Sequence, residues 1–174
     1  MPHSIAVEEG DGIGEDMENK GFQISSIVDG MTLLLKPSMS FSASKNIDRV
    51  GNQEDIKVFT NIASEAFGYN IYPSSLSGLI GENRTTLFIG RYKDNYVSCG
   101  ILFLDSNKDS GLHMIGTRKG FRGLGLGKTM TEHLLYQATK NKSEQVHLVA
   151  SKLGSPIYNK LGFQNRGYLK SYVI

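Results

Sequence analysis

Residues 115–130 read Ile-Gly-Thr-Arg-Lys-Gly-Phe-Arg-Gly-Leu-Gly-Leu-Gly-Lys-Thr-Met, and this stretch decides the fold. An apolar run stops here, four glycines follow, and a helical pattern begins after them. Glycine accepts positive φ and leaves the backbone uncovered, so successive N–H groups can converge on one anion at a helix N-terminus. The segment has no acid before Glu132 to balance its cations, so we expect an anionic ligand from outside the chain. The cations are Arg118, Lys119, Arg122 and Lys128.

Two common phosphate loops do not fit this stretch. The P-loop pattern G-x-x-x-x-G-K-[ST] matches Gly127 and Lys128 but requires glycine where Arg122 stands. The dinucleotide pattern G-x-G-x-x-G begins at Gly123 but meets Lys128 in place of its last glycine. The pattern that remains is Arg-x-x-Gly-x-Gly, in which Arg122 is followed by Gly125 and Gly127 between an apolar run and a helix.

This spacing resembles the pyrophosphate-binding motif of the GNAT superfamily of N-acetyltransferases, which use acetyl-CoA. The resemblance continues in Val-His-Leu-Val-Ala-Ser (146–151) and Gly-Ser-Pro-Ile-Tyr-Asn-Lys-Leu-Gly-Phe (154–163). It implies a mixed α/β fold with a central, mostly antiparallel twisted sheet and helices on both faces. On this interpretation residues 1–40 form an N-terminal arm and β-hairpin, and residues 41–174 form the acetyltransferase domain.

The resemblance also implies a set of functional residues. Tyr158 matches the tyrosine that protonates the departing CoA thiolate in the family. Ser151 stands where many members have an asparagine that contacts the pantetheine arm, and a serine hydroxyl can make only part of that contact. The expected cofactor contacts are Ile115, Gly116, Thr117, Arg122, Gly123, Leu124, Gly125, Leu126, Gly127, Lys128, Ser151 and Tyr158.

The sequence leaves the general base open. His113 lies on the strand that feeds the glycine-rich loop, and imidazole titrates in a useful range. A single histidine on a strand is more often structural, and ordered water alone can serve this reaction. His147, Glu65 and Asp105 are weaker candidates because no motif supports them.

The acceptor is expected to be a primary amine of a small molecule or a peptide. In the superfamily it is selected by the segment after the first helix and by the last strands, and both are aromatic in this chain. The candidate substrate-binding residues are Phe67, Tyr69, Tyr72 and Tyr168. The alternative is a non-catalytic acyl-CoA-binding or partner-binding module that keeps the same fold.

Composition excludes several other classes. The net charge of +2 conceals an acidic stretch, because residues 1–20 hold six acids and one lysine. The remaining cations are scattered and not interleaved with aromatic residues, which argues against a nucleic-acid partner. A single cysteine, Cys99, excludes an internal disulfide and a cysteine metal site. No signal peptide or membrane segment is recognisable, so we expect a cytoplasmic protein without a metal or membrane partner.

Local patterns predict the remaining elements. Residues 1–20 are polar and glycine-rich, which favours a flexible arm. Two apolar runs, 22–27 and 31–35, flank Asp29-Gly30 and predict a hairpin that extends or covers a sheet edge, in this subunit or across a homodimer. Asn-Lys-Gly-Phe-Gln (19–23) nearly repeats Asn-Lys-Leu-Gly-Phe-Gln (159–164), which is consistent with a remnant of a second GNAT-like unit or with chance.

Beyond residue 45 the pattern is regular. We expect a short strand at 46–50, a helix capped by Asn52 and ended by Gly68, and a short helix from Pro73. Strands are predicted at 85–92, 96–104 and 112–117, followed by a helix at 126–139.

Overall fold

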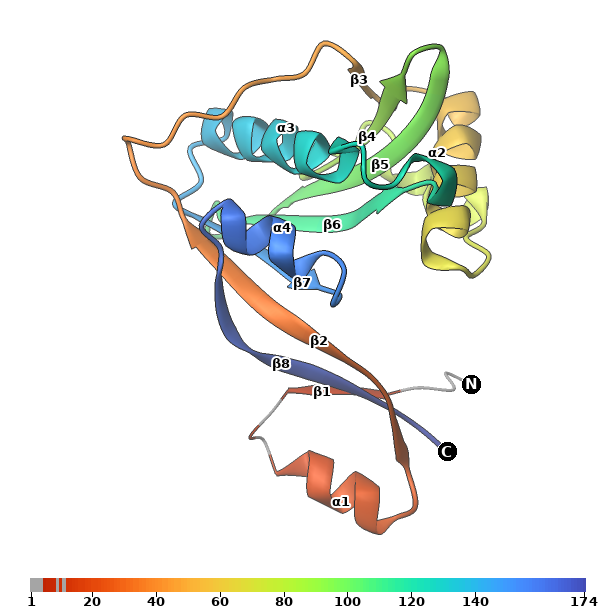
Figure 1. Cartoon of the computed structure of the whole chain (residues 1–174), viewed down its shortest axis with the longest axis vertical. Helices are drawn as coiled ribbons and strands as arrows, with labels where there is room; N and C mark the ends of the chain where they lie inside the picture. Colours follow the sequence, from red (N-terminus) through yellow and green to blue (C-terminus); the bar gives the residue numbers. More distant parts are fainter. Residues whose placement is uncertain (1–4, 9, 11) are drawn as a thin grey trace. The chain divides into compact units, whose positions relative to one another are not determined.

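The structure is a computed structural model, and it describes residues 5–8, 10 and 12–174 (Figure 1). The chain divides into two compact units. Unit 1 combines Met1–Leu33 with His147–Ile174, and unit 2 comprises Leu34–Val146. Within the described residues there are eight β-strands and four α-helices, which confirms the predicted mixed α/β fold. None of these helices is both long and apolar enough to span a bilayer.

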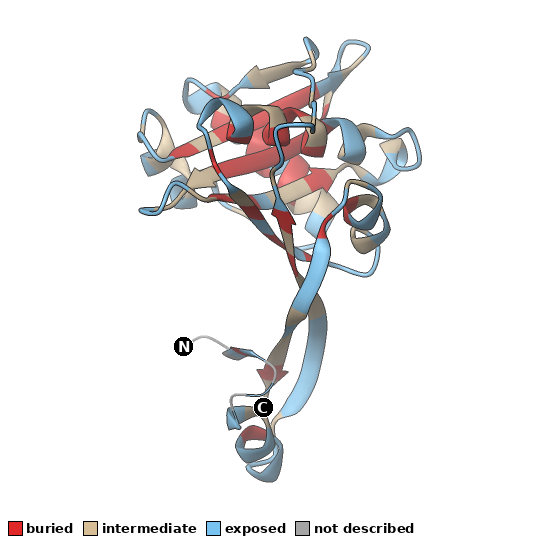
Figure 2. Cartoon of the chain, turned by 90° about the vertical axis from the view of Figure 1, so that its left-hand side faces the viewer, coloured by how far each residue is buried: buried red, intermediate tan, exposed pale blue. Residues whose placement is uncertain are grey.

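Unit 2 is built on an antiparallel sheet. Its strands are β3 (Ile47–Arg49), β4 (Thr85–Tyr92), β5 (Asn95–Leu104) and β6 (Ser110–Thr117), in the spatial order β6-β5-β4-β3. Each neighbouring pair is antiparallel. Val97, Leu87 and Ile89 are almost completely buried, and Figure 2 shows buried residues concentrated in these strands. The predicted strands are confirmed, with β5 and β6 starting one or two residues earlier than expected.

Two helices cover opposite faces of this sheet, as predicted. Cys99 and Ile101 of β5 pack in one core cluster with Ile56 and Phe59 of α2 (Gln53–Phe67). Between them, Gly100 faces α3 (Leu126–Lys140), where an added Cβ would lie 3.0 Å from Leu134 Cδ1. Because side chains alternate along a strand, α2 and α3 lie on different faces.

The ends of α2 follow from its sequence. The Asp55 N–H donates to the Asn52 side chain at 2.9 Å, and Gly68 closes the helix with a φ of 83°. The single helix predicted from Pro73 is wrong in detail, because two 3₁₀ turns stand there, Pro73–Ser75 and Ser77–Leu79. Short 3₁₀ turns are typical of connections too brief to complete an α-helix.

Unit 1 takes its strands from both ends of the chain. Its strands are β1 (Ile5–Glu8), β2 (Gln23–Leu34), β7 (Gln145–Ala150) and β8 (Gln164–Val173), in the order β1-β8-β2-β7. Strand β8 is antiparallel to both β1 and β2. The helices are α1 (Ile13–Asn19) and α4 (Ser155–Lys160).

The prediction of a flexible arm over residues 1–20 is wrong for the described part of that segment. Residues 5–8 form β1 and residues 13–19 form α1. Val7 and Met17 are buried against Tyr172 of β8, with Phe22 packed beside them. The segment is polar on average, so its few apolar residues gave no sign of burial. The residue that they pack against, Tyr172, lies near the other end of the chain. Residues 1–4, 9 and 11 of the predicted arm lie outside the described residues.

The predicted hairpin at Asp29-Gly30 is also wrong, because β2 runs without a turn from Gln23 to Leu34. Asp29 and Gly30 lie within the ladder, opposite Tyr168 and Gly167 of β8. Both apolar runs therefore pair with the same long strand instead of with each other. An Asp-Gly dipeptide permits a turn but does not enforce one when an extended partner strand is present.

Candidate functional site

Strand β6 is distorted just before the glycine-rich loop. Cys99 is opposite Gly116 and Ile101 is opposite His113, so Met114 and Ile115 together face the single residue between them on β5. Met114 has a φ of 50°, which is unusual for a residue with a side chain. This arrangement is a β-bulge, a feature that redirects strand ends beside functional sites.

The C-terminal turn of α2 anchors the segment that follows the bulge. Glu65 accepts a charge-assisted hydrogen bond from Arg118 at 2.5 Å and another from the Lys119 N–H at 3.1 Å. The Arg122 guanidinium donates to the Ala66 carbonyl at 2.8 Å and to the Thr117 carbonyl at 3.4 Å. Gly116 allows α2 to approach, because an added Cβ would lie 2.9 Å from Ala66 Cβ.

These contacts correct the expectation that four cations are available for an anion. Arg118 is paired with Glu65, and Lys128 lies 3.6 Å from Glu132. Two of the N–H groups of the Arg122 side chain already donate to backbone carbonyls. Of the four, only the Lys119 side chain makes neither a hydrogen bond nor an ion pair within the described part of the chain. The side-chain cations at this loop therefore attract an anion less strongly than the sequence suggests. Most of the binding must then come from backbone N–H groups.

The backbone of the loop meets that requirement. The first helical hydrogen bond of α3 runs from the Thr129 N–H to the Gly125 carbonyl at 3.0 Å. The N–H groups of residues 123–128 have no acceptor among the residues that the structure describes. No side chain caps the helix, and its first turn contains no acid. Six adjacent donors and the positive end of a 15-residue helix therefore remain available to a ligand.

Two glycines keep this loop open. Gly123 and Gly125 have φ values of 81° and 78°, which L-residues with a side chain rarely adopt. A Cβ added at either position would meet no atom within 4 Å, so the space beside the amides is free. Unpaired amides beside open space at a helix N-terminus fit a phosphate or diphosphate group. The residues present thus fit the anionic end of coenzyme A.

His113 is placed on β6, three residues before Gly116. Its side chain is exposed overall, but the imidazole packs edge-on against Phe103 with ring centroids 6.4 Å apart. Partial burial lowers the pKa of His113, which favours the neutral form that a general base requires. Two weaker candidates are engaged elsewhere, since Glu65 holds Arg118 and Asp105 accepts the N–H groups of Asn107 and Asp109.

Three of the four aromatic residues proposed for the acceptor lie at the end of α2 or shortly after it. Phe67 and Tyr69 stack with ring centroids 6.2 Å apart, and both are exposed together with Tyr72. Phe67 also lies beside β6, because its Cε2 atom is 3.5 Å from the Cβ position of Gly116. The structure therefore places Phe67 next to the bulged strand, with Tyr69 stacked on it. Tyr168 belongs to β8 in unit 1.

Tyr158 lies on α4 in unit 1 and is only 7% exposed. Its ring packs against Phe163 with centroids 5.8 Å apart. Among the described residues its hydroxyl has no hydrogen-bond partner. Burial raises the pKa of Tyr158 to about 12, so the phenol carries its proton throughout the ordinary pH range.

The turn before α4 is fixed by short polar contacts. The Ser151 hydroxyl accepts the Gly154 N–H at 3.3 Å, so the residue predicted to contact pantetheine also shapes the start of the helix. The Ser155 hydroxyl donates to Asp29 of β2 at 2.5 Å. His147 of β7 contacts Thr32 through its Nδ1 atom at 3.0 Å, which indicates a structural role.

Sequence reasoning missed the anchoring role of Glu65 and of the Ala66 carbonyl. Glu65 is an ordinary acid on a helix 53 residues before Arg118, and a backbone carbonyl carries no sequence signal at all. The only available hint was the excess of cations after β6, which required a counter-charge from elsewhere.

Comparisons with known proteins relate the chain to a family and a fold. A family model described as an acetyltransferase (GNAT) domain matches residues 47–170. No curated protein matches the sequence. A GCN5-related N-acetyltransferase from Kribbella flavida has a TM-score of 0.72 at 17% identity, over 98% of this chain and 67% of that one. One from Sphaerobacter thermophilus has a TM-score of 0.74 at 15% identity, over 97% of this chain and 58% of that one.

A third structure, described as a predicted acetyltransferase with acetyl-CoA from Clostridium acetobutylicum, has a TM-score of 0.58 at 19% identity. The match covers 69% of this chain and 90% of the Clostridium acetobutylicum protein. At these identities the structures establish similarity of fold. The family model extends over most of the sequence, including the bulged strand, the amide-rich loop and α4. The chain therefore belongs to the GNAT acetyltransferase family.

Proposed function

We propose that this protein transfers the acetyl group of acetyl-CoA to a primary amine of a small molecule or peptide. The observation that carries the proposal is the row of backbone N–H groups at residues 123–128, which has open space beside Gly123 and Gly125. Acetyl-CoA supplies the acetyl group as a thioester, which an unprotonated amine attacks at the carbonyl carbon. The family and the structure solved with acetyl-CoA support this donor.

The amide loop would bind the diphosphate of the donor and fix its position. Hydrogen bonds from neutral amides to a charged oxygen are among the stronger kinds in proteins. They also need no counter-charge from a side chain, which suits a loop whose arginines are already engaged. Lys119 would add long-range attraction that depends on salt.

Tyr158 is the proposed acid. When the amine nitrogen bonds to the carbonyl carbon, the carbon–sulfur bond breaks and the electron pair moves to sulfur. The Tyr158 hydroxyl would donate its hydrogen to that sulfur, and its raised pKa ensures that the hydrogen is present beforehand. The buried ring, packed on Phe163, holds the hydroxyl in one orientation.

Phe67, Tyr69 and Tyr72 are proposed to contact the acceptor. Exposed aromatic rings beside a bulged strand suit an amine with an apolar or cationic body, because a cation interacts favourably with the face of a ring. His113 would take the proton released by the attacking amine, a role that its lowered pKa favours.

The donor assignment predicts stabilisation by CoA. A ligand at 100 times its Kd adds about 2.7 kcal/mol to the free energy of unfolding. We therefore expect saturating CoA to raise the midpoint of a calorimetric scan, by an amount that shrinks as salt increases. Adenosine, which lacks the diphosphate, is the control and should give little shift. An unchanged midpoint in CoA would remove the donor assignment, and binding without turnover of any amine would favour a non-catalytic acyl-CoA-binding module.

His113 predicts a pH dependence. A base works only when neutral, and burial lowers the pKa of His113 from the ordinary histidine value of about 6.5. Activity should therefore be retained above this lowered pKa and lost as the pH falls through it. His113→Gln should lower kcat by about a hundredfold and remove this acidic limb. His147→Gln is the matched control and should keep the limb. Superimposable profiles for wild type and His113→Gln would assign the base to water or to another residue.

A further inference from the structure

The two halves of unit 1 share a short sequence and the same order of elements. Gln23 begins β2 and Gln164 begins β8, and both follow Gly-Phe, at 21–22 and at 162–163. Gln23 and Gln164 are 141 positions apart. The same shift of 141 makes β1 (Ile5–Glu8) equivalent to residues 146–149 of β7, and α1 equivalent to α4. Each half is thus a strand, a short helix and a longer strand. The near-repeat at 19–23 and 159–164 therefore lies at the same place in two segments with the same order of elements.

The helix exits are built with the same hydrogen bonds. The Phe22 N–H donates to the Met17 carbonyl at 3.1 Å, and the Phe163 N–H donates to the Tyr158 carbonyl at 3.0 Å. The glycine before each phenylalanine is left-handed, with φ values of 87° and 94°. Such agreement is not required by composition, because many other turns can join a helix to a strand.

The ladder between β2 and β8 has twofold symmetry. Val28 and Leu169 are equivalent under this shift, and they face each other in the ladder. Exchanging the two strands with the same shift converts each pair on one side into a pair on the other side. Gln23–Val173 becomes Thr32–Gln164, and Ser26–Ser171 becomes Gly30–Gly167. Even the bulges correspond. The unpaired residue is Ser25 on β2 and Arg166 on β8, again 141 positions apart.

We infer that residues 5–34 are a second copy of the β-α-β segment 146–174 and act as its partner subunit within one chain. The strand order β1-β8-β2-β7 shows why a partner is needed. Strand β8 lies between β1 and β2, which both belong to the first copy, and neither copy pairs its own two strands. Alone, the second copy would leave both edges of β8 unpaired.

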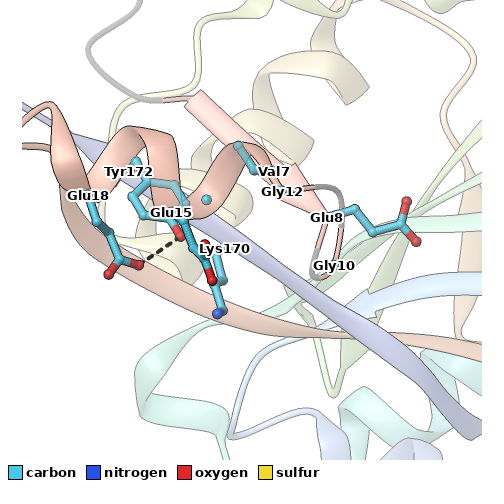
Figure 3. A pocket seen from close by; sticks show the side chains of 9 residues that line it. Val7, Glu8, Gly10, Gly12, Glu15, Glu18, Lys170 and Tyr172 are labelled. Atoms are coloured by element: carbon cyan, nitrogen blue, oxygen red, sulfur yellow. Dashed lines mark hydrogen bonds between the residues drawn. The ribbon is translucent and has the colours of Figure 1, made fainter.

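The first copy is a docking partner and not a second catalytic unit. Met17 occupies the position equivalent to Tyr158, so the first copy has no hydroxyl there. Figure 3 shows its cavity, of about 330 Å³, where Glu15 and Glu18 lie near Lys170 and Tyr172. Carboxylates that line this cavity disfavour an anionic ligand there. The first copy also contacts the second copy directly, because its Asp29 carboxylate accepts a hydrogen bond from the Ser155 hydroxyl on the first turn of α4.

A disulfide across the ladder tests the pairing in the full-length chain. Ser26 and Ser171 are opposed Cα partners, and the only native cysteine, Cys99, is buried. Opposed positions on antiparallel strands lie within the distance that a disulfide spans. We expect the oxidised Ser26→Cys/Ser171→Cys protein to form the bond within one chain, seen as a monomer in non-reducing electrophoresis and, by mass spectrometry, as a peptide crosslinked between positions 26 and 171. The single variant Ser26→Cys is the control. A crosslinked dimer, or no crosslink, would overturn the inference.

A nicked chain tests whether the ladder holds the two copies together. A protease site inserted between the exposed residues Ser42 and Ala43 cuts the connection between β2 and β3. After cleavage both fragments should elute together at the mass of one chain. Val28→Pro at the centre of the ladder should make the nicked fragments separate, because proline removes a backbone donor from an inner strand. Separation of the unsubstituted fragments, or continued association of the Val28→Pro fragments, would contradict the inference. Neither readout depends on activity, so CoA binding and this pairing can fail independently.

Discussion

Tyr158→Phe is expected to lower kcat and kcat/KM together by about a hundredfold, while folding and CoA binding stay close to wild type. General acid catalysis contributes about a hundredfold to ten-thousandfold. Thiolate is a fair leaving group, which places the expected loss at the lower end. Loss of an interaction made only in the transition state reduces both parameters equally. The ring remains to pack against Phe163, so the helix should be preserved.

The pH profile adds a second readout for Tyr158. An acid is active while protonated, so its contribution is lost only as pH rises through its pKa. Burial raises that pKa to about 12, and no alkaline limb from Tyr158 should therefore appear below pH 10. Tyr136→Phe, which removes a hydroxyl from α3, is the control and should leave turnover unchanged. If Tyr158→Phe acetylates its best amine at the wild-type rate while chemistry is limiting, Tyr158 is a packing residue.

Gly125→Glu is expected to abolish CoA binding, and with it the thermal shift. The new side chain would enter the open space beside the amides and place a carboxylate where the diphosphate should bind. Part of the effect on stability is not specific, because an L-residue at this φ costs about 1–2 kcal/mol. The binding measurement must therefore be separated from folding.

Gly81→Glu provides that separation. Gly81 has a φ of 77°, almost the same as the 78° of Gly125, and an added Cβ there also meets nothing within 4 Å. Both variants should lose similar stability without ligand, but only Gly125→Glu should lose the shift in CoA. A full shift in Gly125→Glu, measured by calorimetry and confirmed by titration, would show that the loop is not the diphosphate site.

Much of unit 2 could be predicted from local sequence. Asn52 and Gly68 set the ends of α2 because a cap and a left-handed residue are decided by the residues at those positions. Gly123 and Gly125 likewise predict positive φ and uncovered amides before α3. These features depend on a few neighbouring residues. The family resemblance, based on the loop and on the segment around Tyr158, is confirmed by the match over residues 47–170.

The sequence alone determined the amide loop, the caps of α2, the alternating strands of unit 2 and the family. Tertiary structure decided which charges remain available, since Glu65 neutralises Arg118 from 53 residues away. It also decided that Asp29-Gly30 continues a strand and that Val7 and Met17 are buried, because β8 supplies the partner for both segments. Local preferences set φ and expose donors, but a strand takes its partner from the whole chain, and that choice outweighs the small energy by which a dipeptide favours a turn.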